Sequence, residues 1–386
     1  MKHAPTSTSA SKTAKPPFIP QNLAVLGMTP IAAAILVPLY ALSYGFDWYE
    51  WFWFAFFMVA TGISITGGYH RLWSHRAYEA HWSLRLFFAI FGACAVQNSI
   101  LTWSSDHRDH HRHVDDNEKD PYSAGRGFWF SHMGWILRRW KPHPDDFTNV
   151  KDLQRDPIVA WQHRHYLAIT LTANIALPLL LGFIHGKLWG VFIIATLLRV
   201  VLNHHFTFFI NSLAHIWGRR PYSNANSARD NDLLALVTYG EGYHNYHHRF
   251  QYDYRNGIRW WHFDPTKWMI RSASWVGLTH KLKIVPQLQI ERARLAIQFQ
   301  QALARLDRAE RRDDFRARLE EQYQDYLRAL NDWAKVKQEW YAAKRKELAG
   351  KLDRFELRLR YVDLKYRWKL QRKRWRLMTA QLAQVT

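Results

Sequence analysis

Four apolar stretches dominate the pattern of hydrophobic and polar positions along the chain. They cover residues 23–44, 49–69, 166–184 and 188–210, and each approaches the ~20 residues that a helix needs to cross a bilayer. The turns between the members of each pair, at residues 45–47 and 185–187, are very short, so each pair predicts a hairpin of two spans. The pattern therefore predicts an all-α integral membrane protein with four transmembrane helices.

A fifth apolar run, residues 84–103, is less regular. Arg85, Gln97 and Asn98 interrupt it near its ends. If it crossed the membrane, the histidines before and after it would lie on opposite sides. We therefore expect a helix in the membrane plane or half embedded in it.

Basic residues predict the orientation of the spans. Many Lys and Arg residues lie between positions 71 and 141, whereas the two short turns offer only Lys187. Positive charge is enriched on the cytoplasmic side of membrane proteins. We thus expect the long middle segment and both termini to face the cytoplasm, at a bacterial inner membrane or, in a eukaryote, at the endoplasmic reticulum.

The ends of the chain differ from its centre. Residues 1–21 are rich in Ser, Thr, Pro and Lys and predict a disordered tail before a membrane domain spanning 22–284. Residues 287–386 contain no proline, one glycine and 25 Lys or Arg against 14 Asp or Glu. Apolar residues recur there every three or four positions, so residues 285–386 predict a basic amphipathic helical or coiled-coil extension. Such an extension is either a solvated structural element or an arm that docks on a membrane surface or a partner.

The composition of the chain limits the kinds of metal site and binding partner that we expect. The chain has 386 residues, a net charge of +21 and 21 histidines but a single cysteine, Cys94. One cysteine excludes an intramolecular disulfide and any cysteine-rich zinc or iron–sulfur site. The charge suits contact with anionic lipid or an acidic partner. We do not expect nucleic-acid binding, because no recognised binding module accompanies the charge.

Eight histidines form three clusters. They are His70 and His75; His107, His110 and His111; and His244, His247 and His248. The spacing i, i+3, i+4 of the second and third clusters places three imidazoles on one helical face. The first pair is five residues apart, which requires a bend or a helix end, and Gly67 and Gly68 make one plausible. Eight imidazoles exceed the needs of one metal ion, so we expect two ions on one side of the membrane.

The segments around these clusters resemble the membrane fatty-acid desaturases, specifically the Δ9 acyl-CoA (stearoyl-CoA-like) branch. The similar motifs are GYHRLWSH at 68–75, DHRDHH at 106–111, GFWFSHMGW at 127–135, NSLAH at 211–215 and GEGYHNYHH at 240–248. The resemblance runs from about residue 22 to 282. It implies four transmembrane helices under a cytoplasmic helical cap that holds a di-iron site, with a ninth ligand at His215 and an iron-bound water held by Asn211.

The resemblance also implies a reaction and a substrate site. Members use O₂ and two external electrons to introduce a cis double bond, here at Δ9, into a saturated fatty-acyl chain, with acyl-CoA as the expected carrier. The residues that shape the bend of the acyl tunnel correspond to Gln97, Trp103 and Thr207. The positions near the carrier correspond to Asn98, Asp106 and Arg139, with Arg138 beside them. Acyl-lipid and acyl-carrier-protein substrates stay open.

Several residues are candidates for orienting the metal ligands. Asp106, Asp109 and Glu241 lie beside the histidine clusters and can accept hydrogen bonds from imidazole N–H groups. Arg199 lies midway along the fourth apolar stretch, where a charge normally faces the interior of the helix bundle. We expect Arg199 also to support the metal site.

Two further points concern partners and alternatives. The chain contains no His-Pro-Gly-Gly haem motif, so we expect a separate electron donor: a ferredoxin, a rubredoxin or cytochrome b5. A related membrane di-iron hydroxylase or monooxygenase is the alternative enzyme. A histidine-rich metal transporter is the alternative from another class, and it predicts ligands within the spans. All nine candidate ligands instead lie outside the expected spans or at their ends.

Overall fold

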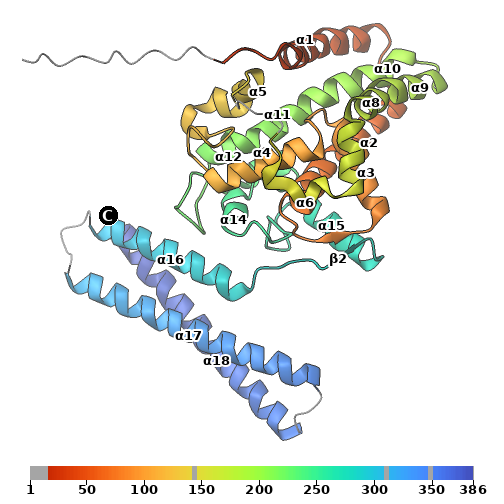
Figure 1. Ribbon diagram of the computed structural model, residues 1–386. Helices are drawn as coiled ribbons and strands as arrows, with labels where there is room; N and C mark the ends of the chain where they lie inside the picture. Colours follow the sequence, from red (N-terminus) through yellow and green to blue (C-terminus); the bar gives the residue numbers. More distant parts are fainter. Residues whose placement is uncertain (1–15, 141–145, 308–312, 347–350, 386) are drawn as a thin grey trace, which may run out of the picture. The chain divides into compact units, whose positions relative to one another are not determined.

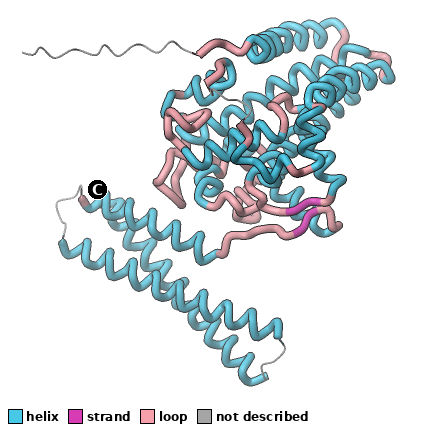
Figure 2. The backbone as a smooth tube through the Cα atoms, viewed as in Figure 1, coloured by secondary structure: helices cyan, strands magenta, loops and turns pink. Residues whose placement is uncertain are grey.

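The computed structural model of the protein describes residues 16–140, 146–307, 313–346 and 351–385. These residues are mostly helical (Figures 1 and 2). Among them, the named strands are β1 (Glu79–Ala80) and β2 (Thr279–His280), which pair antiparallel. The prediction of an all-α protein is confirmed.

The chain forms two compact units. The first contains the residues up to Trp217 together with Asn231–His244 and Tyr254–Leu282, and the second contains Gly218–Asp230, Asn245–Asp253 and the residues from Lys283 onward. The C-terminal boundary lies close to the expected position 285. The segments Gly218–Asp230 and Asn245–Asp253 of the second unit, however, come from inside the stretch expected to form one membrane domain.

Four helical segments are long and apolar enough to cross a membrane. They are Pro20–Ser43, Trp48–Ser74, Tyr166–Ile184 and Leu188–Ile216. The elements that build them are α1 (Pro20–Ser43), α2 (Trp48–Ile63), η1 (Ser64–Ser74), α8 (Tyr166–Leu171), η5 (Thr172–Ala176), α9 (Leu177–Ile184), α10 (Leu188–Phe192), η6 (Ile193–Leu198), α11 (Arg199–Asn211) and α12 (Leu213–Ile216). The four predicted spans are present, and the second and fourth extend further than expected.

The turns of the two hairpins are tied to each other. Asp47 caps α2 by accepting hydrogen bonds from the backbone N–H groups of Tyr49 and Glu50, and the Glu50 carboxylate accepts one from the Asp47 N–H. Asp47 also lies 2.8 Å from Nε2 of His185 and 3.1 Å from Nζ of Lys187, both in the other turn. This capping box and the charge pair together fix both turns at one end of the spans.

The start of the described chain is ordered, which corrects the sequence prediction. Residues 1–15 lie outside the described residues, but α1 already begins at Pro20 and Phe18 forms a β-bridge with Arg138. Asn22 donates to the backbone carbonyl of Ile136 over 2.8 Å. These contacts hold the described part of the expected tail, residues 16–21, in place.

The fifth apolar run forms two helices instead of the single helix expected. α3 (Trp82–Cys94) is too short to span a bilayer, and α4 begins afresh at Ile100 and runs to His113. Between them Val96 has φ 58° and Asn98 has φ 71°, both in the left-handed region. A β-branched residue such as valine rarely adopts this conformation, so the corner is a point of backbone strain that the sequence pattern does not reveal.

Shorter elements lie between and after the long helices. They are η2 (Ala124–Arg126), η3 (Phe130–Gly134), α5 (Trp135–Leu137), η4 (Thr148–Val150), α6 (Lys151–Gln154), α7 (Pro157–Arg164), α13 (Asp232–Val237), α14 (His244–Arg249) and α15 (Pro265–Trp275). α14 starts in the first unit and continues into the second. A buried cluster including Tyr69, Trp73, Phe88 and Ile100 forms an apolar core under η1, α3 and α4.

The C-terminal residues form three long helices. These are α16 (Gln287–Leu306), α17 (Asp313–Lys346) and α18 (Lys351–Val385), which pack side by side (Figure 1). Their core contains Leu319, Leu330 and two tryptophans, Trp333 and Trp368, whose rings stack 4.6 Å apart. The prediction of a helical C-terminal extension is confirmed, and one set of its apolar residues packs into a shared core.

Candidate metal centre and adjoining cavity

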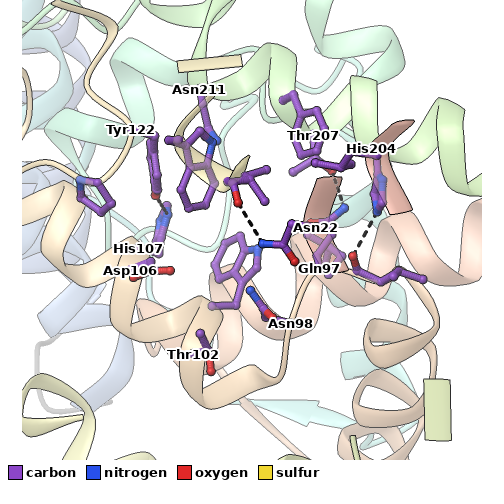
Figure 3. A pocket seen from close by; sticks show the side chains of 18 of the residues that line it. Asn22, Gln97, Asn98, Thr102, Asp106, His107, Tyr122, His204, Thr207 and Asn211 are labelled. Atoms are coloured by element: carbon purple, nitrogen blue, oxygen red, sulfur yellow. Dashed lines mark hydrogen bonds between the residues drawn. The ribbon is translucent and has the colours of Figure 1, made fainter. Parts of the chain in front are cut away.

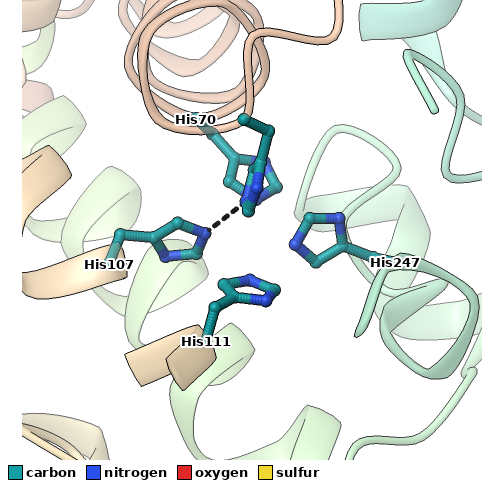
Figure 4. A group of neighbouring side chains, drawn as sticks. His70, His107, His111 and His247 are labelled. Atoms are coloured by element: carbon teal, nitrogen blue, oxygen red, sulfur yellow. Dashed lines mark hydrogen bonds between the residues drawn. The ribbon is translucent and has the colours of Figure 1, made fainter. Parts of the chain in front are cut away.

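All nine candidate histidines fall into two groups. The first comprises His70, His75, His107, His111 and His247, and the second comprises His110, His215, His244 and His248. Within each group the potential ligand nitrogens all lie within 4.8 Å of one another. In the first group the labelled rings surround a common space (Figure 4). Sequence spacing identified the members but not how they divide between two ions.

The two clusters with i, i+3, i+4 spacing each serve both groups. On α4, His107 and His111 belong to the first group and His110 to the second. On α14, His247 belongs to the first group, whereas His244 and His248 belong to the second. Because residues four apart lie on the same strip of a helix and the third lies beside them, one helix can present ligands to two neighbouring ions.

A π-helix explains the unusual spacing of the first pair. η1 is π-helical over Ser64–Ser74, and the His75 N–H donates to the His70 carbonyl over 3.1 Å, an i→i+5 bond. A π-helical turn takes up more residues than an α-helical one, so residues five apart come onto the same face. The centroids of the two imidazoles lie 4.8 Å apart. The expectation of a bend or a helix end is confirmed, because η1 ends at Ser74 and His75 is its C-cap.

Helix α14 is held by residues of its own unit. The Asn245 side chain accepts a hydrogen bond from the Tyr222 N–H and donates to the carbonyls of Ser223 and Ala228. The Tyr246 N–H donates to the Asp230 carboxylate over 3.0 Å. These bonds fix the rotation of α14 about its axis, and with it the direction of its three histidines.

Three of the histidines have a defined partner at Nδ1. Nδ1 of His70 lies 3.0 Å from Glu241, Nδ1 of His110 lies 2.9 Å from Asp120, and Nδ1 of His107 lies 3.1 Å from the hydroxyl of Tyr122. A partner at one imidazole nitrogen sets the tautomer and leaves the other nitrogen for a metal. In each case Nε2 is the atom left to bind.

Glu241 belongs to a buried charge network. Its carboxylate lies 2.9 Å from Arg71, which in turn lies 3.0 Å from Asp264, and all three side chains are almost completely buried. Asn256 also donates to Glu241, over 2.6 Å. Burial raises the pKa of Glu241, but His70 and Arg71 outweigh it and lower the pKa below its usual range. Glu241 is therefore ionised and able to accept from His70.

The electrostatics of the histidines suit metal binding. Burial lowers the pKa values of His75, His111 and His244 well below the usual range, and neighbouring histidines lower them further. The imidazoles are thus neutral, the form that ligates metals. Burial also raises the pKa of Tyr122, which keeps its hydroxyl protonated beside His107.

The spacing of the Nε2 nitrogens also fits a metal. Nε2 of His75 lies 2.8 Å from Nε2 of His107, and Nε2 of His215 lies 3.1 Å from Nε2 of His244. Two nitrogens at right angles on one ion, each at about 2.1 Å, lie about 3 Å apart. Imidazole is a ligand for iron, copper, nickel and zinc. The nine residues can therefore hold metal ions, and the donor set by itself does not select the element.

A cavity of about 630 Å³ adjoins the centre (Figure 3). Its walls include the metal-ligand candidates His70, His107, His110 and His244. All seven residues expected near a substrate line it as well: Gln97, Asn98, Trp103, Asp106, Thr207, Arg138 and Arg139. Asn211 also lines the cavity. Apolar residues of α1, α8 and α11 supply much of the remaining wall, so the cavity suits a long apolar ligand.

Contacts between the cavity residues fix its walls. Gln97 donates to the hydroxyl of Thr207 over 2.9 Å, which joins the α3–α4 corner to α11 (Figure 3). The Trp103 ring stacks on His107 with centroids 4.8 Å apart. The Asn98 backbone N–H donates to the Tyr166 hydroxyl over 3.0 Å. Trp103 thus connects the cavity wall directly to a candidate ligand.

Two residues expected to orient the metal ligands, Arg199 and Asp109, make hydrogen bonds to residues that are not histidines. Arg199 is fully buried, but its hydrogen bonds go to the backbone carbonyl of Cys94, the side chain of Asn174 and its own helix. It joins neighbouring helices, which corrects the expectation that it supports the metal site. Asp109 accepts a hydrogen bond from Asn149 over 2.7 Å.

Sequence reasoning missed several residues of the site. Asp120 and Tyr122 orient two histidines, but four acidic residues lie between positions 115 and 120, and no spacing rule selects one of them. His204 lies outside the three histidine clusters, so their spacing does not select it. Its Nε2 lies 3.0 Å from the Ala95 carbonyl and 3.1 Å from the Val96 carbonyl (Figure 3), so it supports the strained corner that carries Gln97.

The fold and site define a membrane protein with two histidine groups able to bind metal beside a largely apolar cavity. The family model "Fatty acid desaturase" matches residues 17–275, about two thirds of the chain. The chain belongs to the fatty acid desaturase family.

Curated relatives agree with this assignment. Acyl-CoA desaturase 1 of Saccharomyces cerevisiae is 47% identical over 239 residues, which are 62% of this chain and 47% of the relative. Stearoyl-CoA desaturase 5 of Homo sapiens is 39% identical over 253 residues, 63% of this chain and 75% of the relative. The chain spans about half the length of the two yeast relatives that it matches.

Proposed function

We propose that this chain is an oxygen-dependent desaturase that introduces a cis double bond at Δ9 into a saturated fatty-acyl chain carried by coenzyme A. Two iron ions are its cofactors, with His70, His75, His107, His111 and His247 holding one and His110, His215, His244 and His248 the other. Asn211 would hold a water bound to one of the ions. The observation that carries the proposal is that both histidine groups contribute walls to a largely apolar cavity.

The chemistry requires a redox metal, because side-chain acids and bases cannot remove hydrogen from an unactivated alkyl chain. Two bound irons would supply the oxidising power, drawn from O₂. The substrate loses two hydrogen atoms from adjacent carbons; with two external electrons and two protons, these reduce one O₂ to two molecules of water. The reaction therefore balances only with a separate electron donor, for which a ferredoxin, a rubredoxin or cytochrome b5 is suitable.

The residues of the chain have positioning roles in this proposal. The Gln97–Thr207 hydrogen bond and Trp103 hold the acyl chain at the point where it passes the ions. Glu241, Asp120 and Tyr122 keep the imidazole Nε2 atoms turned towards the ions.

The carrier site follows from the polar part of the cavity wall. Arg138, Arg139, Asn98 and Asp106 line the cavity, and an arginine is well suited to bind phosphate groups. We propose that these residues bind the coenzyme A portion on the cytoplasmic side, where the termini also lie. Acyl-lipid and acyl-carrier-protein substrates are alternatives that the assay below distinguishes.

The test is expression of the full chain in a host that requires unsaturated fatty acids. We expect growth without added unsaturated fatty acid, and a cis Δ9 double bond located by mass spectrometry in the host lipids. Purified protein should then convert stearoyl-CoA in the presence of O₂ and a reduced donor. If only acyl-lipid or only acyl-carrier-protein were converted, that molecule and not coenzyme A would be the carrier. A hydroxylated product would identify the enzyme as a hydroxylase.

A matched pair of variants tests the ligands. His247→Ala should abolish growth rescue and reduce bound iron while the protein still inserts into the membrane. His165→Ala is the control, because His165 is exposed and belongs to neither metal group. Rescue by the His247→Ala variant would refute the ligand assignment.

A further inference from the structure

Helix α18 has a row of exposed apolar side chains that the C-terminal helices leave uncovered. The row consists of Phe355, Leu359, Val362, Tyr366, Leu370 and Leu377, which are between 38% and 66% exposed. The first five follow one another at intervals of three or four residues, which places them on one strip of the helix. Six apolar residues in one row are more than the scattered exposed residues normal for a protein surface.

The row is not the packing face of α18. Trp368, Trp375 and Leu382, spaced seven residues apart, are buried in the core shared with α16 and α17. Tyr366 precedes Trp368 by two residues, a rotation of about 200° around a helix with 3.6 residues per turn. The exposed row therefore lies opposite the seam that stabilises the helices, and their packing does not explain it.

Positive charge flanks the exposed row. α18 contains 11 Lys or Arg residues and 3 Asp or Glu residues, a net charge of +8. Lys369 and Arg376 lie beside the row on one side and Arg374 on the other, and Lys373 lies within it; Lys369, Lys373, Arg374 and Arg376 are all exposed. An apolar strip bordered by basic residues is the arrangement of helices that lie in the interface of an anionic membrane.

We propose that α18 binds the headgroup region of an anionic lipid membrane through this row. A second copy of the chain fits less well, because it would bring two helices of the same high positive charge together. The desaturase family model ends at residue 275, so the family assigns no role to this helix. The inference does not depend on the proposed catalytic activity.

The test uses the full-length protein with a fluorescent reporter on the row. Leu359→Cys can be labelled selectively with an environment-sensitive dye, because Cys94 is fully buried and is the only native cysteine. Gln324→Cys, on an exposed position of α17, is the matched control. Each labelled protein is reconstituted in vesicles of phosphatidylcholine alone or of phosphatidylcholine mixed with phosphatidylglycerol, with and without a spin-labelled quencher lipid.

We expect the dye at position 359 to shift to shorter emission wavelength and to be quenched only in the vesicles with phosphatidylglycerol. High salt should reverse both effects, because it screens exposed charges. The dye at position 324 should respond to neither lipid. Lys369→Glu with Lys373→Glu and Arg376→Glu should abolish the response of the 359 dye while leaving the buried seam intact.

Two results would overturn the proposal. One is a dye at position 359 that reports water in both lipid mixtures. The other is self-quenching between labelled chains in phosphatidylcholine alone, which would identify a second copy as the occupant. The salt and lipid measurements use the Leu359→Cys protein with all its basic residues in place. The conclusion therefore does not depend on whether the triple variant folds.

Discussion

The region around the histidine groups and the three C-terminal helices bury different kinds of residue. Around the histidines, the interior contains charged side chains such as Arg71, Glu241 and Asp264, each held by hydrogen bonds. The core of the C-terminal helices is instead aliphatic and aromatic, with Leu330 and Trp333 among its buried residues. Burial around the metal centre fixes the direction of ligands, whereas burial in the helices only supplies stability. Substitutions should therefore fail in different ways in the two regions.

The largest effect should come from breaking the buried charge network. Arg71→Leu leaves Glu241 and Asp264 without their shared cation, which should cost about 3–5 kcal/mol of stability and release bound iron. Thermal unfolding of the detergent-purified protein and metal analysis measure the two losses. Arg76→Leu is the control, because its ion pair with Asp152 is largely exposed and is worth at most ~1 kcal/mol. Equal losses of stability and metal in the two variants would contradict the larger role assigned to the buried network.

A cavity in the C-terminal helices should reduce stability without affecting catalysis. Leu330 is fully buried, and Leu330→Ala should cost roughly 2–5 kcal/mol by loss of packing. We expect unfolding of the helices at lower temperature, followed by circular dichroism, with unchanged turnover per folded molecule at low temperature. A loss of turnover in the folded variant would show that the helices take part in the reaction.

Removing the charge on a ligand-orienting residue should affect metal binding more than folding. Glu241→Gln replaces the carboxylate that accepts from His70, and loss of such a partner weakens metal affinity or activity by about 10–100-fold. Competition with a chelator measures the affinity. Glu79→Gln, at a half-exposed site outside the metal centre, should leave the affinity unchanged. An unaltered affinity in Glu241→Gln would remove this residue from the site.

The smallest effect should appear at the cavity wall. Thr207→Val keeps the shape of the side chain but removes the hydrogen bond from Gln97, a loss of about 1 kcal/mol. We expect a changed ratio of products when acyl chains of several lengths compete. Thr29→Val, which removes a bond only to the carbonyl of Val25 on the same helix, is the control. An unchanged product ratio would argue against a role for this hydrogen bond in substrate placement.

The structural features that follow from periodic patterns in the sequence were the most predictable. The four spans follow from the length of the apolar stretches, and the helical clusters on α4 and α14 follow from the spacing of their histidines. The helical extension follows from its recurring apolar residues and its lack of proline. In each case a local repeat carries the information, so no knowledge of distant contacts is needed.

Features that depend on distant contacts could not be predicted. The spacing of His107, His110 and His111 does not tell which imidazole faces which ion, because that depends on where η1 and α14 lie. Asp120 is selected from several acidic neighbours only by the position of His110. The π-helical form of η1 and the left-handed conformation of Val96 break local preferences, and the surrounding structure enforces them.

The continuous helix formed by α2 and η1 has a consequence for how the chain tolerates changes in length. The segment Trp48–Ser74 has 27 residues without a break and carries His70 near its end. Each inserted residue would advance this end by about 1.5 Å and turn it by about 100°. A simple membrane anchor can absorb such an insertion by tilting, but here the insertion would point the imidazole away from the ion. The number of residues in this span is therefore limited by the place of His70 in its histidine group as well as by the thickness of the bilayer.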